Sequence, residues 1–153
     1  MLNQMSGALG LVIARLPAKS APYLCLFLAW GALLWFLSAS EPSTRFGPEI
    51  PHFDKVLHFC YFAAGGSLLA AYLGLRWSSV TRWKLALMAA MICCVIGRLD
   101  EYHQGFVPGR SGNDTGDWLA DTLGGFSGVW AVMVLVLPRM MSKMPKNPEV
   151  LEE

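Results

Sequence analysis

The residues that could do chemistry are gathered in one polar segment of an otherwise apolar chain. Glu101 and Gln104 are three residues apart and would share one face of a helix. Asp117 and Asp121 are four residues apart and would share a face of a second helix. Carboxylic acids held near a histidine can donate and accept protons during a reaction. The segment therefore predicts acid–base chemistry or the recognition of a polar ligand.

Asp54 and His58 form a similar pair farther upstream, four residues apart. Asp54 suits the N-cap of a helix, which accounts for it without any chemistry. His58 lies within an apolar stretch and needs a hydrogen-bond partner there. Arg110 adds a planar guanidinium that can hold a phosphate or a carboxylate. We therefore predict Glu101, Asp121 and His58 as acid–base groups, and Gln104, Arg110, Asp117 and Asp54 as binding residues.

Two other interpretations of these residues remain open. The site could bind a lipid headgroup or another polar ligand without turnover. It could also be a structural clamp, with Arg110 and Gln104 neutralising carboxylates, because polar groups near a membrane must be paired. A functional site is favoured over the clamp, since charged residues within membranes usually serve a function. Asp100 and Lys55 are expected to have only local roles, in capping or at the membrane surface.

No cofactor and no metal site is predicted from the spacing of these residues. Several acids near one histidine can take a divalent cation, but no spacing here is specific to metal ligands. His103 lies two residues after Glu101 and points off its face, which argues against a haem pair with His58. A lipid-linked substrate would suit a site at membrane depth.

The composition places these residues in a membrane protein. The chain has 153 residues, of which 54% are hydrophobic and only 15% are charged. Soluble domains carry about a quarter charged residues. The mean hydropathy is +0.42, and the apolar residues come in long blocks. The net charge of +1 gives no indication of nucleic-acid binding, so the expected partners are membrane lipids.

Four apolar stretches are long enough to cross a bilayer as helices, which needs about 20 residues each. They are expected at residues 22–39, 56–75, 83–104 and 117–137. The fold class is therefore an all-α membrane protein with four transmembrane helices in an antiparallel bundle. A cleaved signal peptide is the alternative for the first stretch, but its apolar region is long for one, which favours an uncleaved span.

The segments outside the bundle are short. Residues 1–20 form a leader in which apolar residues recur at helical spacing, which is typical of an amphipathic helix on a membrane surface. A weakly ordered leader is the alternative. Residues 21–138 form the four-helix membrane domain, and residues 139–153 form a tail. The sequence does not indicate an oligomeric state.

The positions of lysine and arginine predict which side of the membrane the polar segment faces. Eight of them lie in the leader, the connection after the second stretch and the tail, against four in the two other connections. The positive-inside rule then places both termini in the cytoplasm. The polar segment is therefore expected at the outer surface.

The polar segment also carries the signals of a tight hairpin between the third and fourth stretches. Gly105 marks the end of one helix, and Pro108 with Gly109 suits a turn in which glycine accepts a positive φ. Asp114 can cap the next helix. Asp121 lies deeper and should face the second or third helix, because facing lipid would cost about 2.5–3.5 kcal/mol.

Two motifs can be compared as a pair with known families. The first is the DKVLHF stretch that begins at Asp54, and the second runs DEYHQGFVPGRSGNDTGDWLADTLGG from Asp100 to Gly125. Together they resemble the VanZ-like family of small bacterial membrane proteins, over roughly residues 22–138. The resemblance implies a multi-pass protein of the bacterial inner membrane that serves the cell envelope. The founding member of the family is associated with resistance to the glycopeptide antibiotic teicoplanin.

Overall fold

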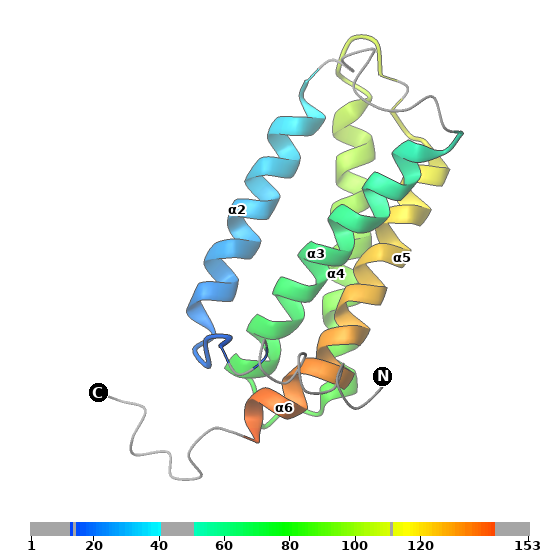
Figure 1. The fold of residues 1–153 in the computed structure, drawn as a ribbon. Coiled ribbons are helices and arrows are strands. Elements are labelled where there is room, and N and C mark those ends of the chain that lie inside the picture. Colours follow the sequence, from blue (N-terminus) through cyan, green and yellow to red (C-terminus); the bar gives the residue numbers. More distant parts are fainter. Residues whose placement is uncertain (1–12, 14, 41–50, 111, 143–153) are drawn as a thin grey trace.

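The computed structural model describes residues 13, 15–40, 51–110 and 112–142, and all regular structure in these ranges is helical (Figure 1). Its four long helices are α2 (Ala21–Ser38), α3 (Phe53–Arg76), α4 (Arg82–Gln104) and α5 (Thr115–Ala131). A short π-helix, η1 (Val132–Val136), and α6 (Leu137–Met141) extend α5. The predicted all-α fold is thus confirmed for the described part of the chain.

Consecutive long helices run in opposite directions, so that four helix ends meet at one end of the bundle (Figure 1). These are the last residues of α2 and α4 and the first residues of α3 and α5. We call this the polar end of the bundle, and its helix-terminal residues are Ser38, Phe53, Gln104 and Thr115. Both polar motifs of the sequence lie there, because one begins α3 and the other spans the α4–α5 connection.

Within the described residues, three helical segments are long and apolar enough to cross a membrane, namely α2, α3 and the continuous stretch Thr115–Met141. The remaining helix, α4, has 23 residues, but charged residues near both of its ends lower its hydropathy. A fourth crossing by α4 therefore stays a prediction. One face of α4 is nevertheless apolar and exposed, with large side chains every four positions at Leu87, Met91, Val95 and Leu99.

The helices α3 and α5 pack closely against each other. A Cβ atom placed on Gly124 or on Gly128 of α5 would clash with backbone carbonyl oxygens of α3. The spacing of these two glycines predicts close helix packing, and the structure confirms it. The short distance between the two backbones brings His58 of α3 within reach of Asp121 of α5.

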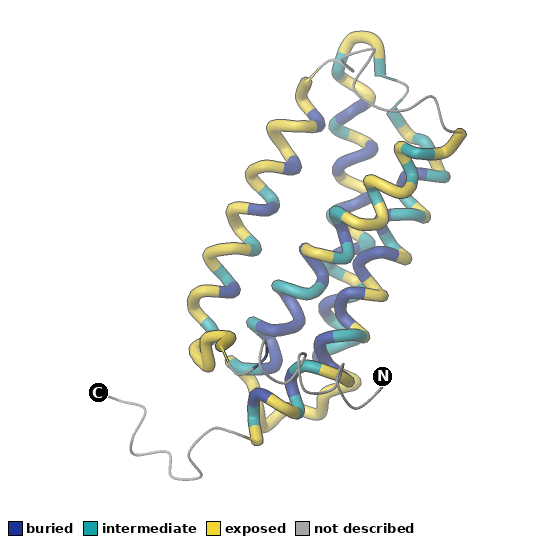
Figure 2. Tube along the Cα trace, viewed as in Figure 1, coloured by how far each residue is buried: buried dark blue, intermediate teal, exposed yellow. Residues whose placement is uncertain are grey.

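The helix α2 contacts the bundle along one narrow face, and most of its other residues are exposed or half-buried (Figure 2). The Trp30 indole donates a hydrogen bond to the Tyr61 carbonyl over 3.0 Å, and the Tyr61 hydroxyl donates to the Trp30 carbonyl over 2.8 Å. These reciprocal bonds fix α2 against α3. Two turns farther along the same face, Ser38 reaches the polar end.

The start of α3 differs from the prediction. The helix begins at Phe53, three residues before the predicted boundary, and its N-cap residue is His52, which has a φ of 63°. Asp54 therefore lies inside the first turn, where its charge still opposes the positive end of the helix dipole. The prediction that Asp54 caps the helix is wrong.

The hairpin between α4 and α5 follows the prediction. Gly105 is the C-cap residue of α4, and Gly109 has a φ of 79° in the turn. The Asp114 side chain caps α5 by accepting hydrogen bonds from the amides of Gly116 and Asp117. The predictions for the leader and the tail lie largely outside the described residues.

Candidate functional site

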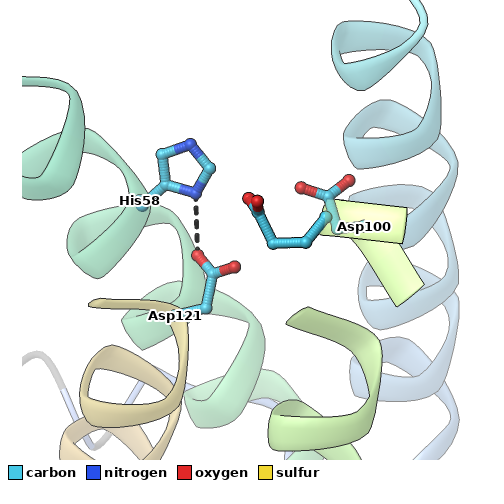
Figure 3. A group of neighbouring side chains, drawn as sticks. His58, Asp100 and Asp121 are labelled. Atoms are coloured by element: carbon cyan, nitrogen blue, oxygen red, sulfur yellow. Dashed lines mark hydrogen bonds and ion pairs between the residues drawn. The ribbon is translucent and has the colours of Figure 1, made fainter. Parts of the chain in front are cut away.

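Four ionisable side chains from three helices converge at the polar end. They are His58 from α3, Asp100 and Glu101 from α4, and Asp121 from α5. Each offers one nitrogen or oxygen atom, and these four atoms all lie within 4.8 Å of one another. Figure 3 shows the His58 ring and the carboxylates of Asp100 and Asp121 turned toward a common space. We call these four residues the acid–histidine cluster.

His58 and Asp121 form a close pair within the cluster (Figure 3). The Nδ1 atom of His58 lies 2.9 Å from Oδ1 of Asp121, and its Nε2 atom lies 3.9 Å from Oδ1 of Asp117. Asp121 is 0% exposed, and its second oxygen has no hydrogen-bond partner in the described part of the chain. A Cβ atom placed on Gly97 of α4 would come within 3.0 Å of that oxygen. Asp121 therefore faces α3 and α4, in agreement with the prediction made from its place in an apolar stretch.

Glu101 is the second deeply buried acid and is only 1% exposed. Its Oε2 atom accepts a hydrogen bond of 2.6 Å from the amide of Asp114, the residue that caps α5. Its backbone carbonyl accepts another, of 3.3 Å, from the amide of Asn113. Glu101 thus ties the α4–α5 connection to the end of α4. Its Oε1 atom has no hydrogen-bond partner among the described residues.

A chain of hydrogen bonds links Asp100 to Arg110. The Ser38 hydroxyl donates to one carboxylate oxygen of Asp100, and the Gln104 amide donates to the other over 2.8 Å. The side-chain oxygen of Gln104 accepts a hydrogen bond of 2.9 Å from Arg110. Arg110 also donates to two backbone carbonyls at the end of α2. The chain therefore joins α2, α4 and the α4–α5 connection around a buried carboxylate.

Lys55 holds a different group of acids at the rim of the polar end. Its Nζ atom lies 2.8 Å from the carboxylates of Asp114 and Asp117 and 2.9 Å from that of Asp54. The lysine therefore ties the start of α3 to the start of α5. Its hydrogen bond, and then the amide of Gly116, hold the pKa of the Asp114 carboxyl below its usual value. We call Lys55 and its three partners the lysine group.

A pocket of about 290 Å³ lies beside the acid–histidine cluster, between α2, α3 and α4. Its polar side is formed by Ser38, His58, Asp100, Gln104 and Arg110. Leucine and aromatic side chains of α2 and α3 line most of the pocket, so its surface is mainly apolar with a few polar groups. A mainly apolar lining with a few polar groups that can orient a ligand is typical of small-molecule binding pockets.

The structure brings most of the predicted site residues together. His58, Glu101 and Asp121 lie in the acid–histidine cluster, and Gln104 and Arg110 line the pocket beside it. Asp117 is buried next to His58, where it also pairs with Lys55. Asp54 is the outlier, because its side chain is 59% exposed and its ion pair is with Lys55. The geometry leaves the chemical role of each residue a prediction.

The clamp interpretation needs a correction, because Arg110 pairs with no carboxylate in the described part of the structure. Its side chain donates instead to Gln104 and to backbone carbonyls. The cation that bridges carboxylates is Lys55, for which only a local role was expected. A clamp therefore exists at the rim of the polar end, and it is built by the lysine group.

Asp100 is the buried residue that the sequence-based prediction missed. A solvated or capping role was expected, yet the side chain is buried, in the cluster, and bonded to Ser38 and Gln104. One signal was available, because Asp100 and Gln104 are four residues apart and share a helical face. The contact with Ser38 could not be foreseen, since it depends on how α2 packs.

Comparison with known proteins agrees with the two motifs. A family model described as VanZ/LLP1 matches residues 19–136, which include all four long helices and both motifs. No curated protein and no solved structure matches the chain significantly.

Proposed function

Because the chain belongs to the VanZ/LLP1 family, we propose that it acts on an amphipathic component of the bacterial cell envelope, at the outer face of the cytoplasmic membrane. The substrate class is a lipid that carries a phosphate or another acidic headgroup, such as a lipid-linked cell-wall precursor. In this proposal the pocket holds the headgroup, and the acid–histidine cluster supplies the acid–base chemistry.

The observation that carries the proposal is a mainly apolar pocket that also contains Ser38, His58, Asp100, Gln104 and Arg110. A small polar substrate would leave the apolar side of the pocket without contacts, whereas a pure hydrocarbon would leave Asp100 and Arg110 facing an apolar ligand. A headgroup joined to a hydrocarbon chain satisfies both sides. The position of the pocket among helices that can cross a membrane also suits a substrate that arrives through the bilayer.

Arg110 is the residue best suited to recognise an acidic headgroup. Its guanidinium lines the pocket, and Gln104 and two backbone carbonyls hold it in place. All of these acceptors are uncharged, so the positive charge of Arg110 is available to a ligand. A guanidinium can bind a phosphate or a carboxylate through two parallel hydrogen bonds.

The acid–histidine cluster places proton donors and acceptors next to the headgroup. His58 and Asp100 line the pocket, and Asp121 orients the His58 ring from behind over 2.9 Å. General acid–base catalysis requires such groups within hydrogen-bond reach of the reacting atoms. A carboxylate bonded to a histidine ring also fixes which ring nitrogen carries the proton.

The orientation of the protein is part of the same proposal. The exposed apolar face of α4, at Leu87, Met91, Val95 and Leu99, favours a fourth membrane crossing. With four crossings, both termini share one side, and the excess of lysine and arginine there favours the cytoplasm. The polar end then faces outward, where cell-wall assembly takes place.

Binding without turnover is the second candidate function, and the pocket favours it as much as catalysis. A lipid headgroup, another envelope component or a glycopeptide could occupy the same polar side. A purely structural role is favoured for the lysine group by its three ion pairs. A purely structural role accounts less well for the acid–histidine cluster, because two buried carboxylate oxygens there lack hydrogen-bond partners among the described residues.

Binding of a polyprenyl phosphate by the full chain in mild detergent tests the proposal, with native mass spectrometry as the readout. The Arg110→Gln variant should bind the lipid at least about tenfold more weakly, because a charge-assisted hydrogen bond contributes about 1.5–3 kcal/mol. Arg98→Gln is the matched control, since Arg98 is an exposed arginine on α4 and should not contribute.

The uncharged polyprenol is the control ligand, and it should bind the wild-type protein about as weakly as the phosphate binds Arg110→Gln. Equal binding of the phosphate to the wild type and to Arg110→Gln would show that the headgroup lies elsewhere. The proposal for the pocket would then be abandoned.

A further inference from the structure

We propose that the acid–histidine cluster holds one divalent metal ion of the manganese and magnesium class. The ion itself follows from the geometry of His58, Asp100, Glu101 and Asp121. Its task in a reaction rests on the proposed function, because it would deepen the role of the same site. The sequence-based expectation of no metal site is thereby replaced.

The distances within the cluster suit a six-coordinate ion. Metal–oxygen distances of about 2.1 Å place neighbouring ligand atoms about 3 Å apart and opposite ligand atoms about 4.2 Å apart. The four candidate atoms lie within 4.8 Å of one another, so shifts of a few tenths of an ångström would close the site. Nδ1 of His58 lies 2.9 Å from Oδ1 of Asp121, so the imidazole and the Asp121 carboxylate are already close enough to share one ion.

Two unpartnered oxygens point independently to a ligand in the cluster. Glu101 is 1% exposed and Asp121 is 0% exposed, yet Oε1 of Glu101 and Oδ2 of Asp121 have no hydrogen-bond partner in the described part of the chain. A buried acceptor without a partner is unfavourable, because it has lost its hydration without compensation. An ion bound between the two carboxylates would satisfy both oxygens.

The charge of the cluster leads to the same conclusion. Asp100, Glu101 and Asp121 are all buried, and none forms an ion pair with a lysine or arginine among the described residues. Lys55 is engaged by the acids of the lysine group, and Arg110 donates to uncharged acceptors. Buried charges in proteins are paired or coordinate metals. A divalent cation would neutralise two of the three carboxylates.

The residues around the cluster also match the surroundings of a metal site. Ser38 and Gln104 each donate a hydrogen bond to Asp100, and the Asp114 amide donates to Glu101. With Nδ1 of His58 on the ion, its Nε2–H would face the Asp117 carboxylate, now 3.9 Å away. Hydrogen bonds of this kind orient ligands, and a carboxylate behind a histidine ligand is a common arrangement.

The donor types decide the class of ion. Three carboxylates are hard oxygen ligands, which suit magnesium, calcium and manganese, whereas an imidazole nitrogen suits transition metals. Manganese accepts both, so Mn²⁺ is the best probe. Because His58 and Asp100 also line the pocket, an ion bound there could contact a headgroup oxygen and polarise it. This would make the substrate an oxyanion, with a phosphate as the leading class.

Mn²⁺ binding tests the proposal without any substrate. The full chain is purified in detergent, stripped with EDTA and titrated with Mn²⁺, and the free ion is followed by electron paramagnetic resonance. We expect about one tightly bound ion per chain in the wild type. The Glu101→Gln and Asp121→Asn variants should bind it at least tenfold more weakly, since even loss of a partner outside the ligand shell costs 10-fold to 100-fold.

Asp54→Asn is the matched control, because it removes an exposed carboxylate from the same end of the bundle and should leave Mn²⁺ binding unchanged. Circular dichroism confirms that each variant is folded. Should Asp121→Asn fail to fold, Glu101→Gln decides alone, since glutamine keeps an oxygen that can accept the hydrogen bond from the Asp114 amide.

Equal Mn²⁺ binding by Glu101→Gln and the wild type overturns the proposal. A folded wild type that binds no Mn²⁺ also overturns the proposal. The buried acids of the cluster would then be neutralised by shared protons and not by a metal ion.

The Arg110→Gln variant separates this proposal from the one for the pocket. It should bind Mn²⁺ as the wild type does, because Arg110 is not part of the cluster. It should still lose the polyprenyl phosphate. If Arg110→Gln no longer bound Mn²⁺, the ion would not lie in the cluster and the metal proposal would be refuted. If Arg110→Gln still bound the lipid, the proposed headgroup site would be refuted.

Discussion

At the scale of single residues, the acids of the polar end fall into two groups with different surroundings. The lysine group, Lys55 with Asp54, Asp114 and Asp117, lies at the rim and pairs its charges. The pair with the exposed Asp54 carboxylate should contribute no more than about 1 kcal/mol, the usual limit for a pair at the surface. The acids of the cluster, Asp100, Glu101 and Asp121, are buried beside a single histidine. Burying several carboxylates close together is energetically unfavourable, and such clusters are typical of functional sites.

The Glu101→Gln substitution should abolish function while the fold survives. Glutamine keeps an oxygen to accept the hydrogen bond from the Asp114 amide, but it cannot exchange a proton or carry a negative charge. If the cluster acts in acid–base catalysis, activity should fall by about a hundredfold or more. If the chain shares the glycopeptide resistance associated with the founding member of its family, glycopeptide sensitivity of cells that depend on the variant measures function, and the melting temperature in detergent measures the fold.

An added Arg110→Gln change should not rescue the Glu101→Gln variant, because the two side chains are not paired in the structure. Rescue by the second substitution would show that the residues interact as a clamp. Unchanged glycopeptide sensitivity in the single variant would instead argue against catalysis and leave binding as the function.

Sequence reasoning anticipated which candidate residues lie together when their partners are on the same helix, or when their position in an apolar stretch requires a polar partner. Glu101 and Gln104 share a helical face, and Asp121 and His58 lie too deep in apolar stretches to face lipid. Asp100 was missed because its burial depends on Ser38 of α2, which is 62 residues away. Lys55 was missed because its reach across to α5 depends on the spacing of two helices. Contacts between distant segments are not encoded in local spacing.

At the scale of helices, the site depends on the close approach of α3 and α5. Gly124→Ala should destabilise the protein by about 1–3 kcal/mol, the usual effect of overpacking, because the new methyl group would clash with the α3 backbone. The separation of the helices would also draw Asp121 away from His58. Melting in detergent measures the stability.

Gly31→Ala is the control for this prediction, because a Cβ atom on Gly31 of α2 would meet nothing within 4 Å. It should leave the stability unchanged or raise it by up to about 1 kcal/mol, since alanine favours the helix. A Gly124→Ala protein as stable as the wild type would show that α3 and α5 are not in close contact.

Helix existence was easier to predict than helix boundaries. The apolar stretches predicted four long helices, and the hairpin signals at Gly105, Gly109 and Asp114 were local and correct. The π-helix η1 was not predicted. It precedes Pro138, which has no amide hydrogen and whose ring crowds the carbonyl four residues earlier, so the regular α-helical pattern is interrupted.

At the scale of the whole molecule, the connections bring four helix ends to one place (Figure 1). Each end contributes at least one polar side chain to the site, and the other end of the bundle does not contain the two motifs. The charges near both ends of α4, which include those at the polar end, explain why it is the one long helix of the described part that lacks a clear hydropathy signal. The site requires charged residues in α4, whereas a membrane crossing requires apolar ones.

The orientation of the polar end can be measured directly. In a chain whose native cysteines are replaced by alanine, single cysteines are placed at Ser111, between α4 and α5, and at Ser79, between α3 and α4. A membrane-impermeant maleimide added to intact cells should label position 111 and spare position 79, because four crossings and the positive-inside rule put the polar end outside. The reverse pattern would place the site in the cytoplasm and exclude a cell-wall substrate on the outer face. Labelling at both positions, or at neither, would show that α4 does not cross the membrane.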